Sequence, residues 1–501
     1  MTAVVIALLI IPAGAGVAAV WLPAQLKGLL TAIAAVASFG LVLALVPALS
    51  RHDIAMSGLI RIDALSAVFL LATSFLYACV AVYSIGYLRT EAGHRSGAAD
   101  YSYTTQFWVG LNLFAWSMLA APMMGNLALL WIAIEVTTII SALLVALEGT
   151  DGAAEAAWKY VLLASAGLAL ALLGTIFAYY AGAHVLGHSY DLGFAPLLHA
   201  AGRLPHTIVR LAFVLAVLGY GTKVGLFPVH TWLPDAHSEA PTPVSALLSG
   251  SLLAVSFYAI LRFYQVAAGT LGSSFPRDVL LVFGVASLLL AALYLLDQQD
   301  YKRLLAYSSV EHMGILAIGV SFGAPVALAG VLLHVLAHAA AKGNAFMGAG
   351  VLVRKFGSKR ITAVTGGLDL LPWSGPLFLI AVLALSAMPP FGIFRSEFEI
   401  VRGGLAAAHD SGAAILVVLV TVAFLGLSLA ANRMLLTPRP AETAQGQAAQ
   451  GQAALARGEP SAWMVVPVVA GVIALLILGL HPPGELTSLL ARAVTALRGP
   501  A

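Results

Sequence analysis

Long apolar runs dominate the chain, and they constrain its fold more than any other feature. About fourteen of them approach the roughly 20 residues that an α-helix needs to cross a bilayer. They lie near residues 3–22, 28–49, 63–88, 106–123, 126–147, 158–181, 207–227, 243–266, 278–296, 303–322, 326–353, 374–400, 411–434 and 462–480. The sequence therefore predicts an all-α polytopic membrane protein with about 14 transmembrane helices.

Composition excludes most other classes of protein. Hydrophobic residues make up 61% of the 501 residues and charged residues 9%, whereas soluble domains carry about 25% charged residues. The single Cys79 and the lack of a CxxC pattern leave no thiolate site for iron–sulfur or zinc. No glycine-rich phosphate-binding motif precedes a helix, and the net charge of +3 is too small to indicate nucleic-acid binding. We therefore expect no cofactor in this chain, and any redox chemistry to belong to a partner.

The stretch from Lys223 to Leu248, KVGLFPVHTWLPDAHSEAPTPVSALL, joins the seventh and eighth runs. Lys223 lies inside the seventh run, and Gly225 and Pro228 interrupt that run. Proline breaks a helix and frees backbone groups. At membrane depth such groups are tolerated only inside protein or beside a water-filled cavity. A buried lysine next to a broken helix is therefore a hypothesis for a functional site.

A second break is predicted in the twelfth run, at Pro389, Pro390 and Gly392. The two broken runs lie five runs apart. Because five is odd, a repeated five-helix unit would insert upside down the second time, as in many transporters. We expect two inverted repeats, formed by spans 4–8 and 9–13.

The resulting division of the chain has five parts. Spans 1–3 fall in residues 1–105, and the first repeat in 106–266. The second repeat falls in 278–434. An Ala/Gln/Gly-rich segment, 435–461, has the composition of a flexible surface linker. Residues 462–501 hold the last span and a tail.

Glu135 lies in the middle of the fifth run, in LALLWIAIEVTTII. A charge at that depth disfavours insertion by about 2.5–3.5 kcal/mol, and Lys223 is the expected partner that offsets part of this. Separation of such a pair would favour release of a proton from Lys223. The alternative is a static ion pair that holds helices together.

His334, His338 and Lys342 are spaced by four residues in GVLLHVLAHAAAKGNAF. Side chains at this spacing lie on one face of a helix, and a row of titratable groups suits proton transfer through intervening waters. A zinc site would need a further carboxylate or thiolate. We therefore predict a proton path here, and no metal.

Glu397, in FGIFRSEFEIV, follows the second predicted break and is flanked by Arg395. It could end the path, or it could be a rim residue paired with Arg395. Asp235, His237 and Glu239 are expected to cap their loop and to meet water or a neighbouring subunit. Accessory candidates for the path are His230, Asp235, His237, Glu311 and His312.

The loops indicate an orientation. On one side of the membrane they carry about 13 Lys and Arg residues, and on the other about 9, and cytoplasmic loops carry the excess. This bias places both termini outside the cytoplasm. The apolar N-terminus lacks a basic n-region, so we expect a spanning helix there and not a signal peptide.

Several motifs resemble a known family. KVGLFPVHTWLPDAHSEAPTPVSALLSG, QDYKRLLAYSSVEHMGIL and HVLAHAAAKGNAF resemble the proton-translocating, antiporter-like subunits of respiratory complex I and their relatives. WIAIEVTTIISALLV, EAAWKYVLLASAGLALALLGTIFAYY, AYSSVEHMGI and PPFGIFRSEF are most similar to the branch of this family formed by the F component of the hydrogenase-4 membrane part. The likeness covers about residues 60–400.

This resemblance implies 14 core helices with two inverted five-helix repeats, in the inner membrane of a prokaryote. It implies that Glu135 and Lys223 form a coupling pair, that His334, His338 and Lys342 continue the axis, and that Glu397 is the exit group. One position departs from the pattern. Many relatives carry a lysine or histidine in span 8, and the matching residue here is Ala254. Water, Ser249 or Ser256 could fill that gap.

The sequence leaves three candidate functions to be tested. The first is a subunit that moves protons in a redox-driven complex of the hydrogenase-4 or NADH-quinone oxidoreductase kind, together with other membrane subunits. The second is a part of a multi-subunit cation/proton antiporter, or of an inorganic-carbon uptake complex, with no redox partner. The third is a scaffold whose buried charges only hold helices together.

Overall fold

The structure is a computed structural model of the chain, and it describes residues 1–56, 58–91, 98–187, 189–438 and 456–498. The first half contains α1 (Thr2–Ala18), α2 (Ala24–Leu49), β1 (Ile54–Met56), β2 (Ile60–Ile62), α3 (Ala64–Glu91), α4 (Ala98–Ala120), η1 (Ala121–Met123), α5 (Leu127–Val145), η2 (Ala146–Glu148), α6 (Asp151–Leu186), α7 (Phe194–His199), η3 (Ala201–Arg203) and α8 (His206–Val224). The middle contains α9 (Leu233–Glu239), α10 (Thr242–Leu247), the π-helical η4 (Leu248–Leu252), α11 (Leu253–Leu271), α12 (Ser274–Leu295), α13 (Tyr301–Phe322) and α14 (Pro325–Phe356). The last part contains η5 (Ile361–Ala363), α15 (Gly367–Leu370), α16 (Ser374–Leu385), α17 (Gly392–Ala406), α18 (Asp410–Leu435), α20 (Ala462–Leu480) and α21 (Gly484–Arg498).

The prediction of a helical, multi-pass membrane protein is confirmed. In the described residues, 11 helices are long and apolar enough to cross a membrane, and α1 and α16 are shorter apolar helices. The predicted run 106–123 falls mostly in α4, and the run 374–400 is divided between α16 and α17. Most of the predicted linker 435–461 lies outside the described residues.

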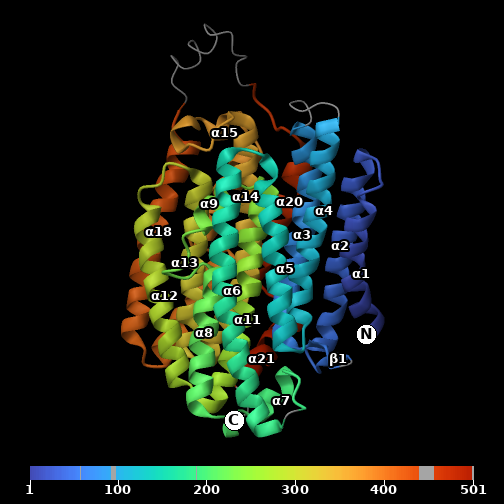
Figure 1. Cartoon of the computed structure of the whole chain (residues 1–501). Coiled ribbons are helices and arrows are strands. Elements are labelled where there is room, and N and C mark those ends of the chain that lie inside the picture. Colours follow the sequence, from blue (N-terminus) through green and yellow to red (C-terminus); the bar gives the residue numbers. More distant parts are fainter. Residues whose placement is uncertain (57, 92–97, 188, 439–455, 499–501) are drawn as a thin grey trace.

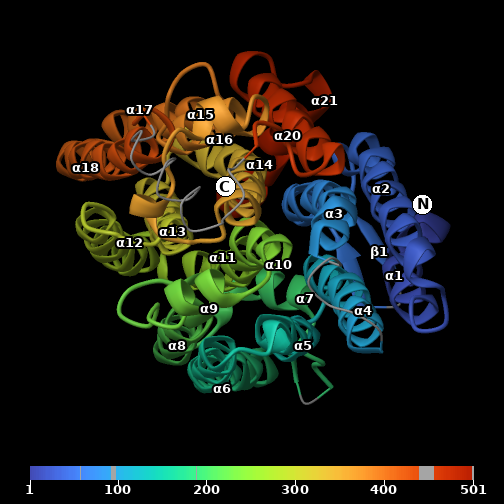
Figure 2. The same ribbon diagram turned by 90° about the horizontal axis from the view of Figure 1, so that it is seen from above.

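The helices stand side by side in one bundle, as Figures 1 and 2 show. Seen from above, α10, α11 and α14 occupy the middle, with α5 and α6 at one edge and α12 and α18 at another. The most apolar parts of the spans containing α11 and α13 are fully buried, whereas α6, α18 and α20 expose much of their surface. The N-terminus, α7 and α21 lie at the lower end in Figure 1, and α15 lies at the upper end.

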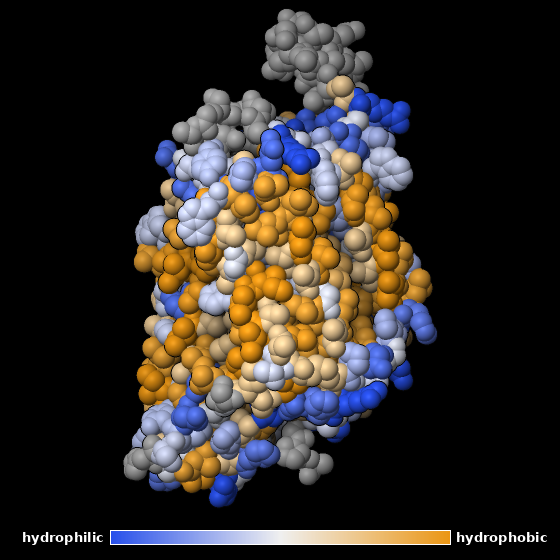
Figure 3. Space-filling model, turned by 90° about the vertical axis from the view of Figure 1, so that its right-hand side faces the viewer, coloured by the Kyte–Doolittle hydropathy of each residue, from blue (hydrophilic) through white to orange (hydrophobic). Residues whose placement is uncertain are grey.

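On the face shown in Figure 3, a broad apolar band lies between two polar ends. Large aliphatic side chains such as Leu143, Val282 and Leu480 are exposed on α5, α12 and α20. In water such a surface would drive aggregation, so its extent fits a chain surrounded by lipid.

The two predicted helix breaks are both present. The first follows α8, where Gly225 has a φ of 83° and ends the helix in the left-handed conformation that favours glycine. The chain resumes as the short α9 and α10 before α11 begins. The second break separates α16 from α17, and Ala387, with a φ of 52°, lies within it.

Side-chain caps fix where two of the central helices begin. Asn126 accepts hydrogen bonds from the backbone N–H groups of Ala128 (2.8 Å) and Leu129 (3.3 Å) at the start of α5. Asp300 accepts from Lys302 N–H (2.7 Å) and Arg303 N–H (3.0 Å) at the start of α13. Such caps satisfy backbone donors that the first turn leaves free.

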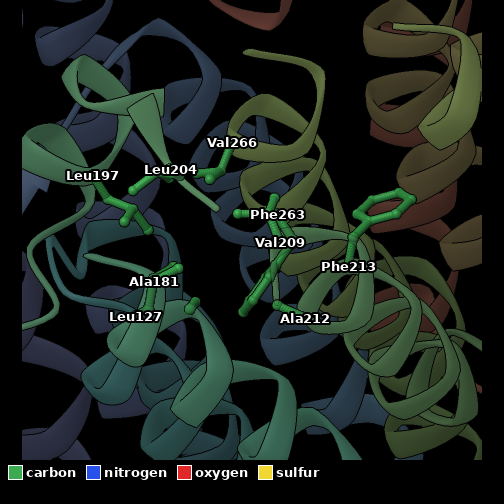
Figure 4. Close-up of a pocket in the computed structure, with 10 residues that line it drawn as sticks. Leu127, Ala181, Leu197, Leu204, Val209, Ala212, Phe213, Phe263 and Val266 are labelled. Carbon is green, nitrogen blue, oxygen red and sulfur yellow. The ribbon is translucent and has the colours of Figure 1, made fainter. Parts of the chain in front are cut away.

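At the lower end a small pocket forms where α5, α6, α7, α8 and α11 meet (Figure 4). Its lining is entirely apolar, and the labelled residues are Leu127, Ala181, Leu197, Leu204, Val209, Ala212, Phe213, Phe263 and Val266. This pocket offers no charge or hydrogen-bonding group, so the candidate chemistry lies elsewhere.

Candidate functional site

Glu135 lies on α5, half-buried against α6. Its Oε1 accepts a hydrogen bond from Ser165 Oγ at 3.1 Å. Its Oε2 is buried and has no hydrogen-bond partner among the described residues. A buried carboxylate oxygen without a partner is unfavourable, so this group is poorly suited to a purely structural role.

Lys223 is fully buried in the last turn of α8. Its ammonium group donates to Tyr160 OH of α6, and Nζ lies 4.8 Å from the centre of the Tyr160 ring. Tyr160 OH in turn contacts Ser141 Oγ of α5 at 2.8 Å. The hydrogen-bond partner of the Lys223 ammonium group is thus a hydroxyl group and not a carboxylate.

Glu135 and Lys223, the expected partner charges, are not in direct contact. No ion pair joins them in the part of the chain that the structure describes, and each contacts a hydroxyl of α6 instead. The two charges are nevertheless close enough to interact electrostatically.

The segment after the first break places its titratable residues in different surroundings. Asp235 pairs with Arg303 (2.8 Å) and lies 3.7 Å from Lys159, at a partly exposed surface. Glu239 pairs with Lys359 at 2.8 Å. These two residues meet the polar surface, as the sequence predicts.

His237 does not meet water, contrary to the expectation for its loop. Its side chain is fully buried, because α9 folds inward and packs against α6 and α13. Neither ring nitrogen has a hydrogen-bond partner among the described residues. His230 is also buried, 6.1 Å from the ring of Phe227, and its Nδ1 has no described partner.

The second half of the site is built on α14. His334, His338 and Lys342 are all fully buried, and the two imidazole rings lie parallel to within 17° at 6.2 Å. The ammonium group of Lys342 donates to the Leu305 carbonyl (2.9 Å) and to Ser308 Oγ, both on α13. Like Lys223, Lys342 thus donates hydrogen bonds to uncharged oxygen atoms of a neighbouring helix.

His312 of α13 brings three helices together. Its Nδ1 lies 3.1 Å from His334 Nε2 and 3.9 Å from Glu397 Oε1. His334 Nδ1 lies 2.9 Å from Ser396 Oγ, so α17 orients that ring. His338 has no hydrogen-bond partner for either nitrogen in the described chain, and its ring lies 5.2 Å from that of His312.

Two carboxyl groups complete this cluster. Glu397 is buried on α17, and its Oε1 has no hydrogen-bond partner among the described residues. It does not pair with Arg395, which contacts Glu399 at 3.2 Å. Glu311 is buried on α13, and its charge interacts with that of Lys342.

Three members of this cluster could also hold a metal ion. One ligand atom each from His312, His334 and Glu397 lies within 4.8 Å of the others, and two imidazoles with a carboxylate are a common zinc ligand set. The sequence pattern pointed to His334 and His338 with Lys342, and it did not place His312 and Glu397 beside them. That this chain carries no metal or cofactor stays a prediction.

A buried ion pair outside this cluster has a full set of partners. Arg262 of α11 donates to Oδ1 of Asp63, the residue before α3, and to Tyr258 OH, each at 2.8 Å, and it also contacts Gln265 at 3.0 Å. This ion pair joins the lower ends of two helices. The hydrogen-bonding groups of this ion pair have partners, whereas several ring nitrogens and carboxylate oxygens of the α13, α14 and α17 cluster have none among the described residues.

Sequence reasoning missed the hydroxyl groups. Tyr160, Ser165, Ser308 and Ser396 contact Lys223, Glu135, Lys342 and His334 respectively. The available signal was weak, because serine, threonine and tyrosine are ordinary residues of membrane helices.

More than half of the chain matches a known family. The model of the family described as "NADH:quinone oxidoreductase/Mrp antiporter, TM" matches residues 124–425. The chain belongs to this family. A second family model, "NADH-Ubiquinone oxidoreductase (complex I), chain 5 N-terminus", matches residues 49–96.

Family members with different names are similar to this chain. It is 36% identical over 366 residues to "Hydrogenase-4 component F homolog" of Methylacidiphilum infernorum, covering 72% of this chain and 75% of that protein. It is 30% identical over 422 residues to "NADH-quinone oxidoreductase subunit N" of Desulforudis audaxviator, covering 84% and 81%. It is also 30% identical over 355 residues to a protein of Rhizobium meliloti named as the A/B subunit of a probable K(+)/H(+) antiporter, and this match covers 69% of this chain and 33% of that protein.

Solved structures share the fold of this family member. A chain of the membrane-bound sulfane sulfur reductase, an archaeal respiratory membrane complex, matches with a TM-score of 0.83 at 21% identity, covering 99% of this chain and 97% of that one. A chain of the Mrp complex from Dietzia sp. DQ12-45-1b matches with a TM-score of 0.83 at 21% identity, covering 99% and 96%. Both neighbours are parts of multi-subunit membrane complexes.

Proposed function

We propose that this chain is the proton-translocating membrane subunit of a redox-driven complex of the hydrogenase-4 or NADH-quinone oxidoreductase kind. One observation carries the proposal. Ionisable side chains gather in two groups, and almost all of them are buried: Glu135 with Lys223 on α5 and α8, and His334, His338, Lys342 and Glu397 on α14 and α17. Ionisable groups inside a membrane protein are energetically unfavourable. They are therefore rare there, and they mark either a transport path or a fully paired structural site.

The contacts support a path rather than a scaffold. Buried charges that only hold helices together should be saturated with partners, as Asp63 and Arg262 are. Oxygen or nitrogen atoms of Glu135, His338 and Glu397 have no hydrogen-bond partner among the described residues. Such atoms can exchange protons with intervening waters, so the proposed order of transfer is Glu135, Lys223, the α14 residues and Glu397, with His312 and Glu311 beside them.

The architecture proposed with this function has 14 spanning helices in two inverted five-helix repeats, with one broken helix in each. The N-terminal three spans, the two repeats, the linker and the last span keep the boundaries given above. We place the chain in the inner membrane of a prokaryote, with both termini outside the cytoplasm and without a cofactor of its own. Its partners would be other membrane subunits of the complex, one of which supplies the redox chemistry.

A second function is favoured by a specific observation. The Rhizobium meliloti relative bears the name of a K(+)/H(+) antiporter component, so the same helices could exchange a metal cation for protons without a redox partner. The two functions differ in what copurifies with the chain and in what drives transport.

The test begins with the native complex, purified through a tag on this chain. We expect a redox-active partner, and proton uptake into proteoliposomes, followed with a pH-sensitive dye, when that partner is supplied with its substrate. Potassium- or sodium-driven proton exchange without such a partner would favour the antiporter instead. Glu135→Gln should abolish proton movement while the complex still assembles; unchanged movement with lowered stability would leave only the scaffold.

A further inference from the structure

The proposed path has a gap between its halves. Lys223 lies on α8 and Lys342 on α14, and the span-8 position where many relatives carry a lysine or histidine is Ala254, on α11. Ser256 and Ser249 are poor substitutes, because Ser256 Oγ donates to the Leu252 carbonyl of its own helix (3.0 Å) and Ser249 Oγ contacts Ser309 Oγ (2.7 Å).

His237 lies in the region between the two halves. Its ring is 6.0 Å from that of Trp232, which packs at 4.4 Å on the ring of Tyr160, the residue that accepts the hydrogen bond of Lys223. It is also 6.0 Å from the ring of Phe346, which lies one helical turn beyond Lys342 on α14. His237 also interacts electrostatically with Lys342 and with Lys302.

The ring nitrogens are buried without a strong partner. Neither forms a hydrogen bond of normal geometry among the described residues, although the backbone of Leu233 interacts with the ring, and a buried polar group left in this way calls for an explanation. A neutral imidazole accepts a proton at one nitrogen and carries a donor at the other. It can therefore pass a proton on without leaving its place.

The backbone of α9 fixes that place. Ser245 Oγ donates to the His237 carbonyl at 2.7 Å. Ser238 Oγ donates to Asp300 Oδ2 at 3.0 Å, and Lys302 Nζ donates to the Ala240 carbonyl at 2.7 Å. The short helix is thereby tied to α13 and to the chain that follows it, so the ring is positioned by three separate contacts.

We propose that His237 transfers protons between Lys223 and Lys342, in the role that a span-8 side chain would otherwise fill. This inference rests on the proposed proton path. One ring nitrogen takes a proton, through water, from the Lys223 side and forms imidazolium; the other nitrogen releases its proton toward Lys342. A neutral ring remains in the opposite tautomer, and it returns by exchange with water or by rotation of the ring.

The test compares variants of the purified complex in proteoliposomes. His237→Phe keeps an aromatic ring between Trp232 and Phe346 but removes the exchangeable protons, and we expect proton movement to fall roughly tenfold or more. His409→Phe is the matched control, since His409 stacks on Phe322 at 5.7 Å outside the path. If the phenylalanine is not accommodated, His237→Gln removes proton transfer near neutral pH while retaining polarity.

A rescue separates transfer from structure. Introducing a titratable side chain at the vacant span-8 position, in the double variant His237→Phe with Ala254→His, should restore part of the lost proton movement. A purely structural role for His237 would not produce such recovery.

The outcomes distinguish this inference from the function on which it rests. Wild-type proton movement in His237→Phe, together with its loss in Glu135→Gln, would overturn the role of His237 and leave the path intact. Wild-type movement in both variants would overturn the path itself.

Discussion

At the scale of single residues, the charged groups could be predicted and their partners could not. Glu135 and Lys223 stand out because a charge in an apolar run is unfavourable and therefore rare. Tyr160 does not stand out, because its role depends on α6 packing between α5 and α8. His312 lies on α13 and reaches His334 only because α13 packs against α14. The sequence therefore indicated it only as an accessory candidate, whereas it assigned the α14 residues to the path itself.

Tyr160→Phe tests the hydroxyl that holds Lys223. The change keeps the ring that packs on Trp232 but removes the acceptor for the ammonium group and the contact with Ser141. We expect proton movement to fall by about five- to tenfold with the complex still assembled, measured by dye quenching in vesicles. Tyr180→Phe, on the exposed face of the same helix, should behave as wild type; equal effects of the two changes would contradict the role of Tyr160.

Arg262→Met tests the paired group outside the path. It leaves the buried Asp63 carboxylate without its main partner, which should lower the free energy of unfolding by about 3–5 kcal/mol. A thermal-denaturation assay in detergent measures this. Lys159→Met removes the exposed Lys159–Glu155 pair on α6 and should lower the denaturation temperature far less. If both variants lowered the denaturation temperature equally, burial of the ion pair would not explain the effect of Arg262→Met.

At the scale of helices, both breaks follow from local sequence, because glycine and proline act on the backbone directly. The inward fold of α9 does not. A polar stretch such as HTWLPDAHSE is ordinarily a surface loop, and only its packing against α6 and α13 buries His237. Predicted runs and observed helices agree in position, but the sequence could not indicate which helices occupy the middle of the bundle.

The contact between α6 and α8 depends on glycines. A Cβ at Gly219 would lie 2.4 Å from the backbone nitrogen of Ala171, and one at Gly167 would lie 2.4 Å from Thr222 Oγ1. Small residues allow membrane helices to approach closely. Gly219→Val should therefore separate Tyr160 from Lys223 and reduce the yield of folded protein on size-exclusion chromatography. Gly40→Val on α2, where nothing lies within 4 Å, should leave the yield unchanged, and an equal loss there would show that valine itself is at fault.

At the scale of the whole molecule, the proposed orientation assigns the two polar ends to opposite sides of the membrane. Arg51 is exposed after α2, and Arg360 is exposed after α14. Because α2 ends at the lower end in Figure 1 and α14 at the upper, single cysteines at these positions, with Cys79→Ala as background, should label differently. A membrane-impermeant maleimide added to intact cells should modify Arg51→Cys and spare Arg360→Cys; the reverse pattern would invert the topology.

Lys223 and Lys342, one in each half of the site, have the same kind of hydrogen-bond partner. Each ammonium group is cradled by a hydroxyl oxygen and has no carboxylate in direct contact within the described chain. A hydroxyl accepts from an ammonium group and can equally donate to a neutral amine. The same hydroxyl can therefore bind either charge state of the lysine. In the proposed path, a proton would then pass by rotation of an O–H bond, without the breaking of an ion pair.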